Sequence, residues 1–241
     1  MPDFHSIVTE YWFKKMSGDV QHFENESFCL TINNSLDESN SIMVLGVVNG
    51  KTRVTLSSKV AEALMLSKIE ITNLEQLEVY LAEKKLKLHG PDNLYYFSHQ
   101  NQLKLLNESD KKNIRPLTSE DKNAFSQFER LASKDDLENA YVELEHWLVY
   151  GAFEGQQLVC AASMYDWDNT QFADIGVLTL DPFRDKGYAK KVISAMSKKA
   201  IQLGYEPQYR TQIDNQASIA LANSLGLSLF AKWDVISPDC K

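Results

Sequence analysis

The chain has 241 residues, of which 44% are hydrophobic, and a formal net charge of -8 at pH 7. This length suits two small domains, and the acidic balance argues against nucleic acid as a partner. No apolar run approaches the roughly 18 residues that a membrane-spanning helix needs, and residues 1–15 lack the apolar centre of a signal peptide. We therefore expect a cytoplasmic protein that does not bind membranes.

The first part of the chain predicts a small α/β unit. Residues 3–15 predict a short helix. Asn49-Gly50, between the apolar runs 42–48 and 51–56, is a strong signal for a two-residue β-hairpin turn. Further along, the pattern predicts helices over 58–67 and 73–84 and a short strand over 94–97.

The polar stretch NESDKKN, residues 107–113, has no apolar member and predicts a linker. We therefore expect two domains, an accessory α/β domain over 1–113 and a second domain over 114–241. The histidines of the first domain are scattered and form no catalytic constellation.

Capping patterns mark two helix starts after the predicted linker. Thr118 and Asp121 have capping spacing, as do Ser133 and Asp136. The remaining elements expected in this part are strands over 147–153 and 156–165 joined at Glu154-Gly155, a strand over 174–180, a helix from 189 to 203, a strand over 207–212, a helix over 216–225 and a last strand pair over 227–236.

Cysteine usage predicts neither a disulfide framework nor a metal site. Cys29, Cys160 and Cys240 are odd in number and lack metal-ligand spacing. Cys160 lies in the apolar run LVCAAS and is expected to be a small buried hydrophobic residue.

The segment DIGVLTLDPFRDKGYA, residues 174–189, is the most informative stretch. It places a β-rich apolar run before Arg184-x-x-Gly187-x-Ala189 and an amphipathic helix. Gly187 permits close approach of the backbone to a ligand, and the free N–H groups at the start of the helix favour an anion. This arrangement predicts a cradle for pyrophosphate.

Basic residues gather in and just after the predicted cradle, although the chain is acidic overall. Such a local cluster suits a polyphosphate ligand, whereas the solvated face of an amphipathic helix explains Lys198 and Lys199 better. The cluster consists of Arg184, Lys186, Lys190, Lys191, Lys198 and Lys199.

The spacing of Arg184, Gly187 and Ala189 resembles motif A of the GNAT acyltransferase superfamily. The segment YRTQIDNQASIALANSLGL, residues 209–227, is similar to a later strand and helix of that superfamily, and IRPLTSEDKNAF, residues 114–125, resembles its opening strand and first helix. The resemblance spans about residues 114–236. It implies an α/β fold with a mixed, largely antiparallel sheet and helices on both faces, and residues 1–113 could be a degenerate second copy.

The resemblance also implies acetyl-CoA as co-substrate, bound between two splayed strands and attacked directly by an amine. Backbone amides from Arg184 to Ala189 would hold the pyrophosphate, residues 177–179 would pair with the pantetheine arm, and an N–H near Leu178 would stabilise the oxyanion. The residues expected to bind the co-substrate are Val177, Leu178, Thr179, Arg184, Asp185, Lys186, Gly187, Tyr188, Ala189, Asn215 and Ser218.

Candidate acid and base residues depart in part from the superfamily pattern. Relatives often place a tyrosine seven residues beyond the asparagine as the general acid, where this chain has Ala222; the candidate substitutes are Tyr209, Tyr188 and water. Asp174 is the first candidate for the base, with a strand-edge carboxylate or a partner for a nearby basic residue as the equal alternative. Glu143, Glu145 and His146 are reserve candidates.

These observations predict an N-acetyltransferase acting on a small-molecule or peptide amine, with no metal and no nucleic acid. The loop 166–170 is expected to border the acceptor pocket, and a homodimer is left open. A non-catalytic acyl-CoA-binding protein is the main alternative. A third interpretation makes residues 1–113 an interaction domain that delivers the transferase to a protein acceptor.

Overall fold

The computed structural model describes residues 3–109 and 111–240, without the side chain of Cys240. Contacts between Cα atoms divide the chain into two compact units. The first comprises Met1–Leu94, Thr211–Asn215 and Leu229–Lys241, and the second comprises Tyr95–Arg210 and Gln216–Ser228. Each unit is therefore discontinuous in sequence. The expected division into domains 1–113 and 114–241 stays a prediction, because a unit that is compact by its contacts need not be a domain that folds on its own.

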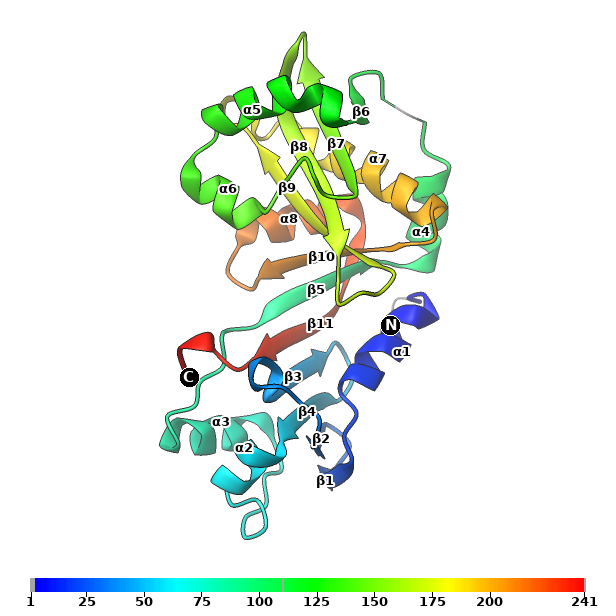
Figure 1. Cartoon of the computed structure of the whole chain (residues 1–241). Coiled ribbons are helices and arrows are strands. Elements are labelled where there is room, and N and C mark those ends of the chain that lie inside the picture. The colour runs from blue at the N-terminus through cyan, green and yellow to red at the C-terminus, as the bar shows by residue number, and fades with distance from the viewer. Residues whose placement is uncertain (1–2, 110, 241) are drawn as a thin grey trace. The chain divides into compact units, whose positions relative to one another are not determined.

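The first unit is a sheet with helices against its faces (Figure 1). Its strands run in the order β1-β2-β4-β3-β11, with β2 and β4 parallel and the other neighbours antiparallel. Its elements are α1 (Ser6–Lys15), β1 (Val20–Glu24), β2 (Phe28–Asn33), η1 (Glu38–Asn40), β3 (Ile42–Val47), β4 (Thr52–Ser57), α2 (Ser58–Ala63), α3 (Leu74–Glu83), β11 (Leu227–Val235) and η4 (Pro238–Cys240).

The two faces of this sheet have different neighbours. On one face, α2 and α3 cover a core that includes Leu30, Val54 and Leu77, all fully buried. On the other face lies α1, where the rings of Trp12 and Trp233 are 4.9 Å apart. Burial of such side chains stabilises the unit because each removes apolar surface from water.

The second unit carries the segment with the predicted cradle. Its strands run in the order β5-β10-β9-β8-β7-β6, and the pairs from β6 to β9 are antiparallel, whereas β9 and β10 are parallel. Its elements are β5 (Asp92–Phe97), α4 (His99–Leu106), β6 (Ile114–Pro116), η2 (Ser119–Asp121), α5 (Lys122–Leu131), α6 (Lys134–Ala140), β7 (Leu148–Glu154), β8 (Gln157–Asp166), β9 (Phe172–Thr179), η3 (Asp181–Phe183), α7 (Tyr188–Gln202), β10 (Glu206–Gln212) and α8 (Gln216–Leu225).

Helices cover both faces of the strands in this unit, with α5 and α6 on one side and α7 on the other (Figure 1). The alternation of side chains along β9 explains this arrangement, since Leu178 joins the core of Phe125 and Phe128 from α5. A mixed, largely antiparallel sheet flanked by helices is the fold class that the sequence predicted.

Several local predictions are confirmed. Asn49 has a positive φ of 55° in the turn between β3 and β4, which pair antiparallel as expected for a hairpin. The side chains of Thr118 and Asp121 form a reciprocal capping box, and the Ser133 hydroxyl accepts a hydrogen bond from the Asp136 N–H at the start of α6.

One expectation needs correction, and three elements were missed. The predicted strand pair over 227–236 is a single strand, β11, because its residues pair continuously with β3 from Ala231↔Val47 to Val235↔Met43. Strands β1 and β2 and helix α4 were not predicted. Cys29 and Cys160 are buried free thiols, and the side chain of Cys240 lies outside the described residues.

Candidate active site

Strands β9 and β10 separate at Asp174. The parallel register joins Phe172 to Glu206 and ends at Asp174↔Gln208, although β9 continues to Thr179. On its other side, β9 stays paired with β8 as far as Thr179↔Cys160. The stretch from 175 to 179 therefore has one paired edge, and an extended ligand can hydrogen-bond to the other.

The strand residues predicted to bind pantetheine lie on this separated part of β9. Leu178 is buried in the core beneath α5, so only its backbone can serve a ligand. Val177 and Thr179 are half-buried on the opposite face. The Thr179 hydroxyl donates to Cys160 Sγ at 3.1 Å, and burial raises the pKa of that thiol to about 12, which keeps it protonated and unreactive.

The turn between β9 and α7 is held by Arg184. Its guanidinium contacts a carboxylate oxygen of Asp136 at 2.9 Å and one of Asp181 at 2.9 Å, and its Nε donates to the Thr179 carbonyl at 3.2 Å. The predicted phosphate ligand Arg184 therefore uses its side chain to fasten the end of β9 to α6 and η3. The charge of Arg184 is already shared with two carboxylates.

Gly187 begins α7 in a left-handed conformation, with φ 74° and ψ 18°. An added Cβ would find no atom within 4 Å, so the space beside it is open. No side chain of the described residues caps α7 at Gly187, and the first N–H groups of a helix have no partner within the helix. Asp185 also has a positive φ, 60°. This open amino end, reached through two left-handed residues, fits a phosphate group.

Aromatic rings support the basic residues around the turn. Lys186 Nζ lies 4.9 Å from the centre of the Phe183 ring, and Lys191 Nζ lies 5.4 Å from that of Tyr188. The Tyr188 hydroxyl bonds to Glu154, and this acceptor raises the pKa of the phenol. Thus Lys186 and Lys191 bring positive charge to the cradle, whereas the Tyr188 hydroxyl is held away from it by β7. Ala189 lies in the first turn of α7.

Further predicted residues lie near α8. Asn215 directly precedes this helix, and its N–H donates to the Gln212 carbonyl at 3.2 Å. The Ser218 hydroxyl bonds to Tyr209, which is buried. Burial raises the pKa of the Tyr209 phenol. Ala222, where relatives often carry the tyrosine acid, is fully buried.

Asp174, the predicted base, is only 1% exposed and accepts hydrogen bonds from three side chains. Arg210 Nη2 lies 2.7 Å from Oδ2 and Arg210 Nε lies 2.8 Å from it. Gln208 donates to Oδ1 at 3.0 Å, and the Tyr165 hydroxyl donates to Oδ2 at 2.7 Å. Both oxygens of the carboxylate are therefore already engaged by neighbouring side chains.

The pair formed by Asp174 and Arg210 dominates the local electrostatics. Burial alone would lower the pKa of Arg210, but the charge of Asp174 raises it overall. Burial and the same negative charge raise the pKa of Tyr165 well above its usual range. The Arg210 guanidinium also lies 4.5 Å from the ring centre of Trp167, in the loop expected to border the acceptor pocket.

Three of the residues at this site were not predicted from the sequence: Arg210, Gln208 and Tyr165. A signal for the first two was present, because positions 208 and 210 share one face of a strand that was correctly predicted. Their meeting with Asp174 depends on the parallel register of β9 and β10, which the sequence pattern does not contain.

His146, a reserve candidate for the base, lies in a group of polar and aromatic side chains. Its Nδ1 is 2.8 Å from the Ser163 hydroxyl, and its Nε2 is 3.6 Å from a carboxylate oxygen of Glu143. The rings of Tyr141 and Tyr165 are each 5.1 Å away. Burial lowers the pKa of His146, against the smaller opposite effect of Glu143 and Glu145. The imidazole is therefore neutral near pH 7 and able to accept a proton. Glu145 itself is exposed.

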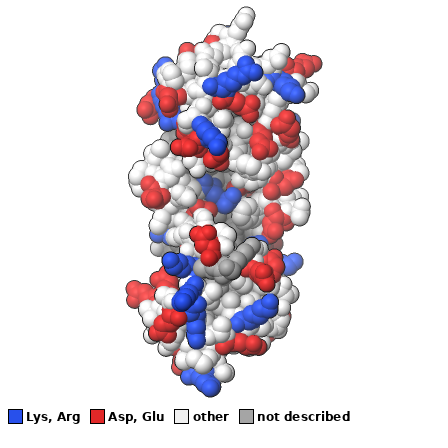
Figure 2. All heavy atoms as spheres, turned by 60° about the vertical axis from the view of Figure 1, so that its left-hand side comes forward, with Lys and Arg blue, Asp and Glu red and all other residues white. Residues whose placement is uncertain are grey.

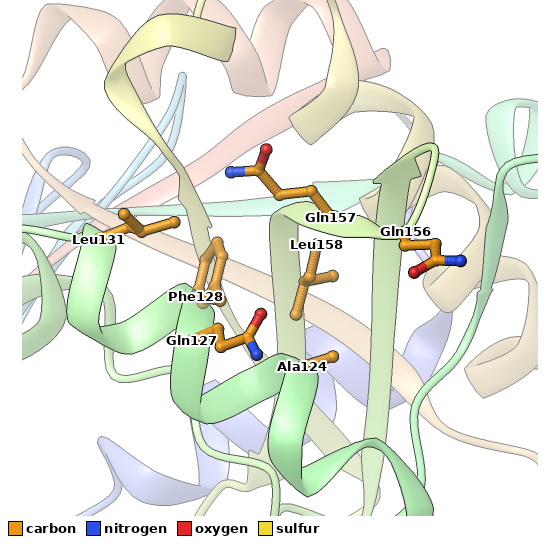
Figure 3. A pocket seen from close by; sticks show the side chains of 7 residues that line it. All are labelled: Ala124, Gln127, Phe128, Leu131, Gln156, Gln157 and Leu158. Carbon is orange, nitrogen blue, oxygen red and sulfur yellow. The ribbon is translucent and has the colours of Figure 1, made fainter.

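A separate hollow of about 290 Å³ lies between α5 and the turn of the β7–β8 hairpin (Figure 3). Its lining includes the apolar side chains of Phe128 and Leu158 and three glutamines. None of its lining residues is titratable, so it offers no acid or base for amine chemistry. The lining residues are Ala124, Gln127, Phe128, Leu131, Gln156, Gln157 and Leu158.

The described residues contain no helix that is both long and apolar enough to cross a bilayer. Within residues 3–109 and 111–240, no three His, Cys, Asp or Glu side chains come together as a metal site would require. On the face shown in Figure 2, basic and acidic side chains are interspersed.

Residues 14–236 match the family model described as GNAT acetyltransferase. This match covers most of the chain and extends the resemblance found over 114–236 into the amino-terminal part. The chain belongs to the GNAT acetyltransferase family.

No curated protein matches the sequence. Solved structures similar to this chain include a GNAT-family acetyltransferase from Novosphingobium aromaticivorans, at 17% identity and a TM-score of 0.49, covering 63% of this chain and 66% of that one. Another, from Colwellia psychrerythraea, has 21% identity and a TM-score of 0.48, covering 62% and 56%. An aminoglycoside 6'-N-acetyltransferase from Acinetobacter haemolyticus has 20% identity and a TM-score of 0.37, covering 49% and 92%. The chain thus spans just under two thirds of the length of the Novosphingobium protein and just over half of that of the Colwellia protein.

Proposed function

We propose that the protein is an N-acetyltransferase that transfers an acetyl group from acetyl-CoA to a primary amine. The observation that carries this proposal is the end of β9–β10 pairing at Asp174, followed on the same chain segment by the open amino end of α7 at Gly187. An extended arm and a pyrophosphate can be bound by these two consecutive features.

The chain's own groups fit such a co-substrate. Backbone N–H groups from Asp185 to Ala189 would bind the pyrophosphate, and Lys186 and Lys191 would add positive charge. The free edge of residues 177–179 would bind the pantetheine, and the N–H of Leu178 would stabilise the oxyanion. Asn215 and Ser218 would bind from the start of α8. The thioester supplies the activated acyl group when it is bound.

We propose His146 as the group that receives the proton of the amine, in place of the first candidate Asp174. Burial lowers the pKa of His146, so its imidazole is neutral near pH 7 and available to receive a proton, whereas the oxygens of Asp174 are already engaged by Tyr165, Gln208 and Arg210. Asp174 then acts as a positioning residue, since it holds Tyr165 and Arg210 on the face of the sheet where His146 lies.

Loss of the usual tyrosine at position 222 is compatible with turnover. A thiol has a pKa of about 8.5 and leaves readily as an anion, so a positioned acid is an accelerator and not a requirement. The Tyr188 hydroxyl bonds to Glu154, and Tyr209 bonds to Ser218. Of these two candidates, Tyr209 is the better substitute, because a relay through the Ser218 hydroxyl would connect it to the start of α8.

The acceptor is proposed to be a small molecule or a peptide with a primary amine. Aromatic rings of Tyr141, Tyr165 and Trp167 lie on the same face as His146 and Asp174, and such rings attract ammonium groups. We further propose that the reaction needs no metal, that the protein binds no nucleic acid and that it is cytoplasmic. A homodimer is left open.

The main alternative is a protein that binds acyl-CoA without catalysis. A panel of primary amines incubated with acetyl-CoA and the full chain, scored for release of free thiol, separates the two. Amine-dependent thiol release that needs the intact protein supports the transferase. Saturable CoA binding without thiol release for any amine favours the binding protein.

A further inference from the structure

Helix α1 covers only part of one face of the sheet in the first compact unit (Figure 1). Its carboxyl end is fastened to the strands, since the Thr55 hydroxyl donates to the Met16 carbonyl at 2.7 Å and Trp12 packs against Trp233. Toward the amino end of α1, the contact with the strands gives way to a cavity.

This cavity has a volume of about 510 Å³, which is in the range of small-molecule sites. Its walls come from α1 and the residues before it, from β3 and β4 with their connecting turn, and from β11. Six of its lining residues are apolar: Phe4, Phe13, Val47, Val48, Leu229 and Phe230. The Phe13 side chain is 40% exposed, although it belongs to a helix that packs on a sheet.

Arg53 brings a positive charge to this apolar cavity. Its guanidinium lies over the Phe13 ring, 4.5 Å from the ring centre, and the residue is half-buried. Among the described residues no group accepts a hydrogen bond from it or lies within ion-pair distance, and the carboxylate that interacts with its charge, Glu24, already pairs with Lys51. The second base, Lys51, forms an ion pair with Glu24. A guanidinium has five donors in a planar fork that matches a carboxylate.

We propose that this cavity binds a small amphipathic carboxylate, with its apolar body against the phenylalanine and valine side chains and its carboxylate on Arg53. A cationic ligand would meet the charges of Arg53 and Lys51, and only the exposed Asp3 opposes them within the lining. A neutral apolar ligand would leave the guanidinium without an acceptor. The site belongs wholly to the first compact unit and is independent of the acetyl-transfer residues.

Calorimetric titration of the full chain with decanoate, decanol and decyltrimethylammonium tests the charge requirement. Decanoate should bind with one site per chain, decanol about tenfold to a hundredfold more weakly, and the cation not measurably, because a charge-assisted hydrogen bond contributes this much. Arg53→Gln should reduce decanoate affinity to that of decanol and leave decanol affinity unchanged. Equal affinity for decanoate and decanol, or no saturable binding, would overturn the proposal.

Two variants keep the test interpretable. Lys59→Gln removes an exposed base on α2, outside the cavity lining, and should leave decanoate binding unchanged. Val48→Trp fills the cavity and should abolish binding of both decanoate and decanol. If Val48→Trp has a wild-type circular dichroism spectrum and still binds decanoate, the carboxylate lies elsewhere and the assignment fails.

Discussion

The buried Asp174 of β9 and the half-buried Arg210 of β10 form an ion pair at the point where the two strands separate, with Arg210 Nη2 2.7 Å from Asp174 Oδ2. The Asp174 carboxylate accepts hydrogen bonds from three side chains, those of Tyr165, Gln208 and Arg210. The pair therefore holds together two strands whose backbone pairing has just ended.

Removing the charge of Asp174 should destabilise the fold. In Asp174→Asn, the half-buried Arg210 loses its counter-charge, and we expect the free energy of unfolding to fall by about 3 kcal/mol in urea titrations. Replacing both residues, as Asp174→Asn with Arg210→Met, should recover part of this loss. The exposed Asp166 of β8 provides the control, because Asp166→Asn should change stability by less than about 0.5 kcal/mol. A fully stable Asp174→Asn protein contradicts a structural role for the pair.

His146→Gln should remove a basic group from the reaction. Wild-type kcat/KM should fall as pH drops through the lowered pKa of His146, because the protonated imidazole cannot accept a proton. The variant should be about 10² to 10⁴-fold slower at neutral pH and lose that limb of its pH profile. His99→Gln, at an exposed position, serves as the control. If the acidic limb survives in His146→Gln and disappears in Asp174→Asn, the carboxylate is the base.

Much of the local structure was predictable because its causes are local. The turn at Asn49 and the caps at Thr118 and Ser133 depend on residues within a few positions of one another. Strand β1 and helix α4 were missed because their patterns are weak: β1 is largely exposed, and α4 buries only Gln102 and Leu105.

Longer-range relationships were not predictable from patterns. The pairing of β11 with β3 joins segments about 190 positions apart, and nothing in either strand specifies its partner. At the site, the cradle at Gly187 followed from a contiguous motif. The contact between Asp174 and Arg210 did not, because it depends on register in a parallel pair.

Glu206 of β10 should make stability depend on pH. It is 5% exposed, its oxygens accept from Gln102 at 2.7 and 2.9 Å, and burial raises the pKa of its carboxyl to about 7. Below its unfolded pKa of about 4.5 the carboxyl is neutral in both states, so it adds no penalty. As pH rises from about 4.5 to about 7, the unfolded state loses its proton first, and stability should fall by up to about 3 kcal/mol.

Glu206→Gln checks this directly in urea titrations at pH 5 and pH 8. The variant should be less sensitive to pH than the wild type and more stable than it at pH 8. Glu129→Gln, at an exposed position of α5, should behave as the wild type. If the stability of the wild type and that of Glu206→Gln change by the same amount between pH 5 and pH 8, the buried carboxyl is not the cause of the pH dependence.

Calorimetric titration of the full chain with acetyl-CoA probes the phosphate cradle at the start of α7 through a pair of glycine variants. Gly187 and Gly204 both have a positive φ, 74° and 87°, and open space beside the Cα, but they lie at opposite ends of α7. Gly187→Asp and Gly204→Asp therefore introduce similar backbone strain and the same charge. We predict that the wild type and Gly204→Asp bind acetyl-CoA with one site per chain, and that Gly187→Asp binds at least tenfold more weakly, since its carboxylate faces the phosphate. Equal binding by the two variants, or no binding by the wild type, would show that the start of α7 does not bind the phosphates of acetyl-CoA.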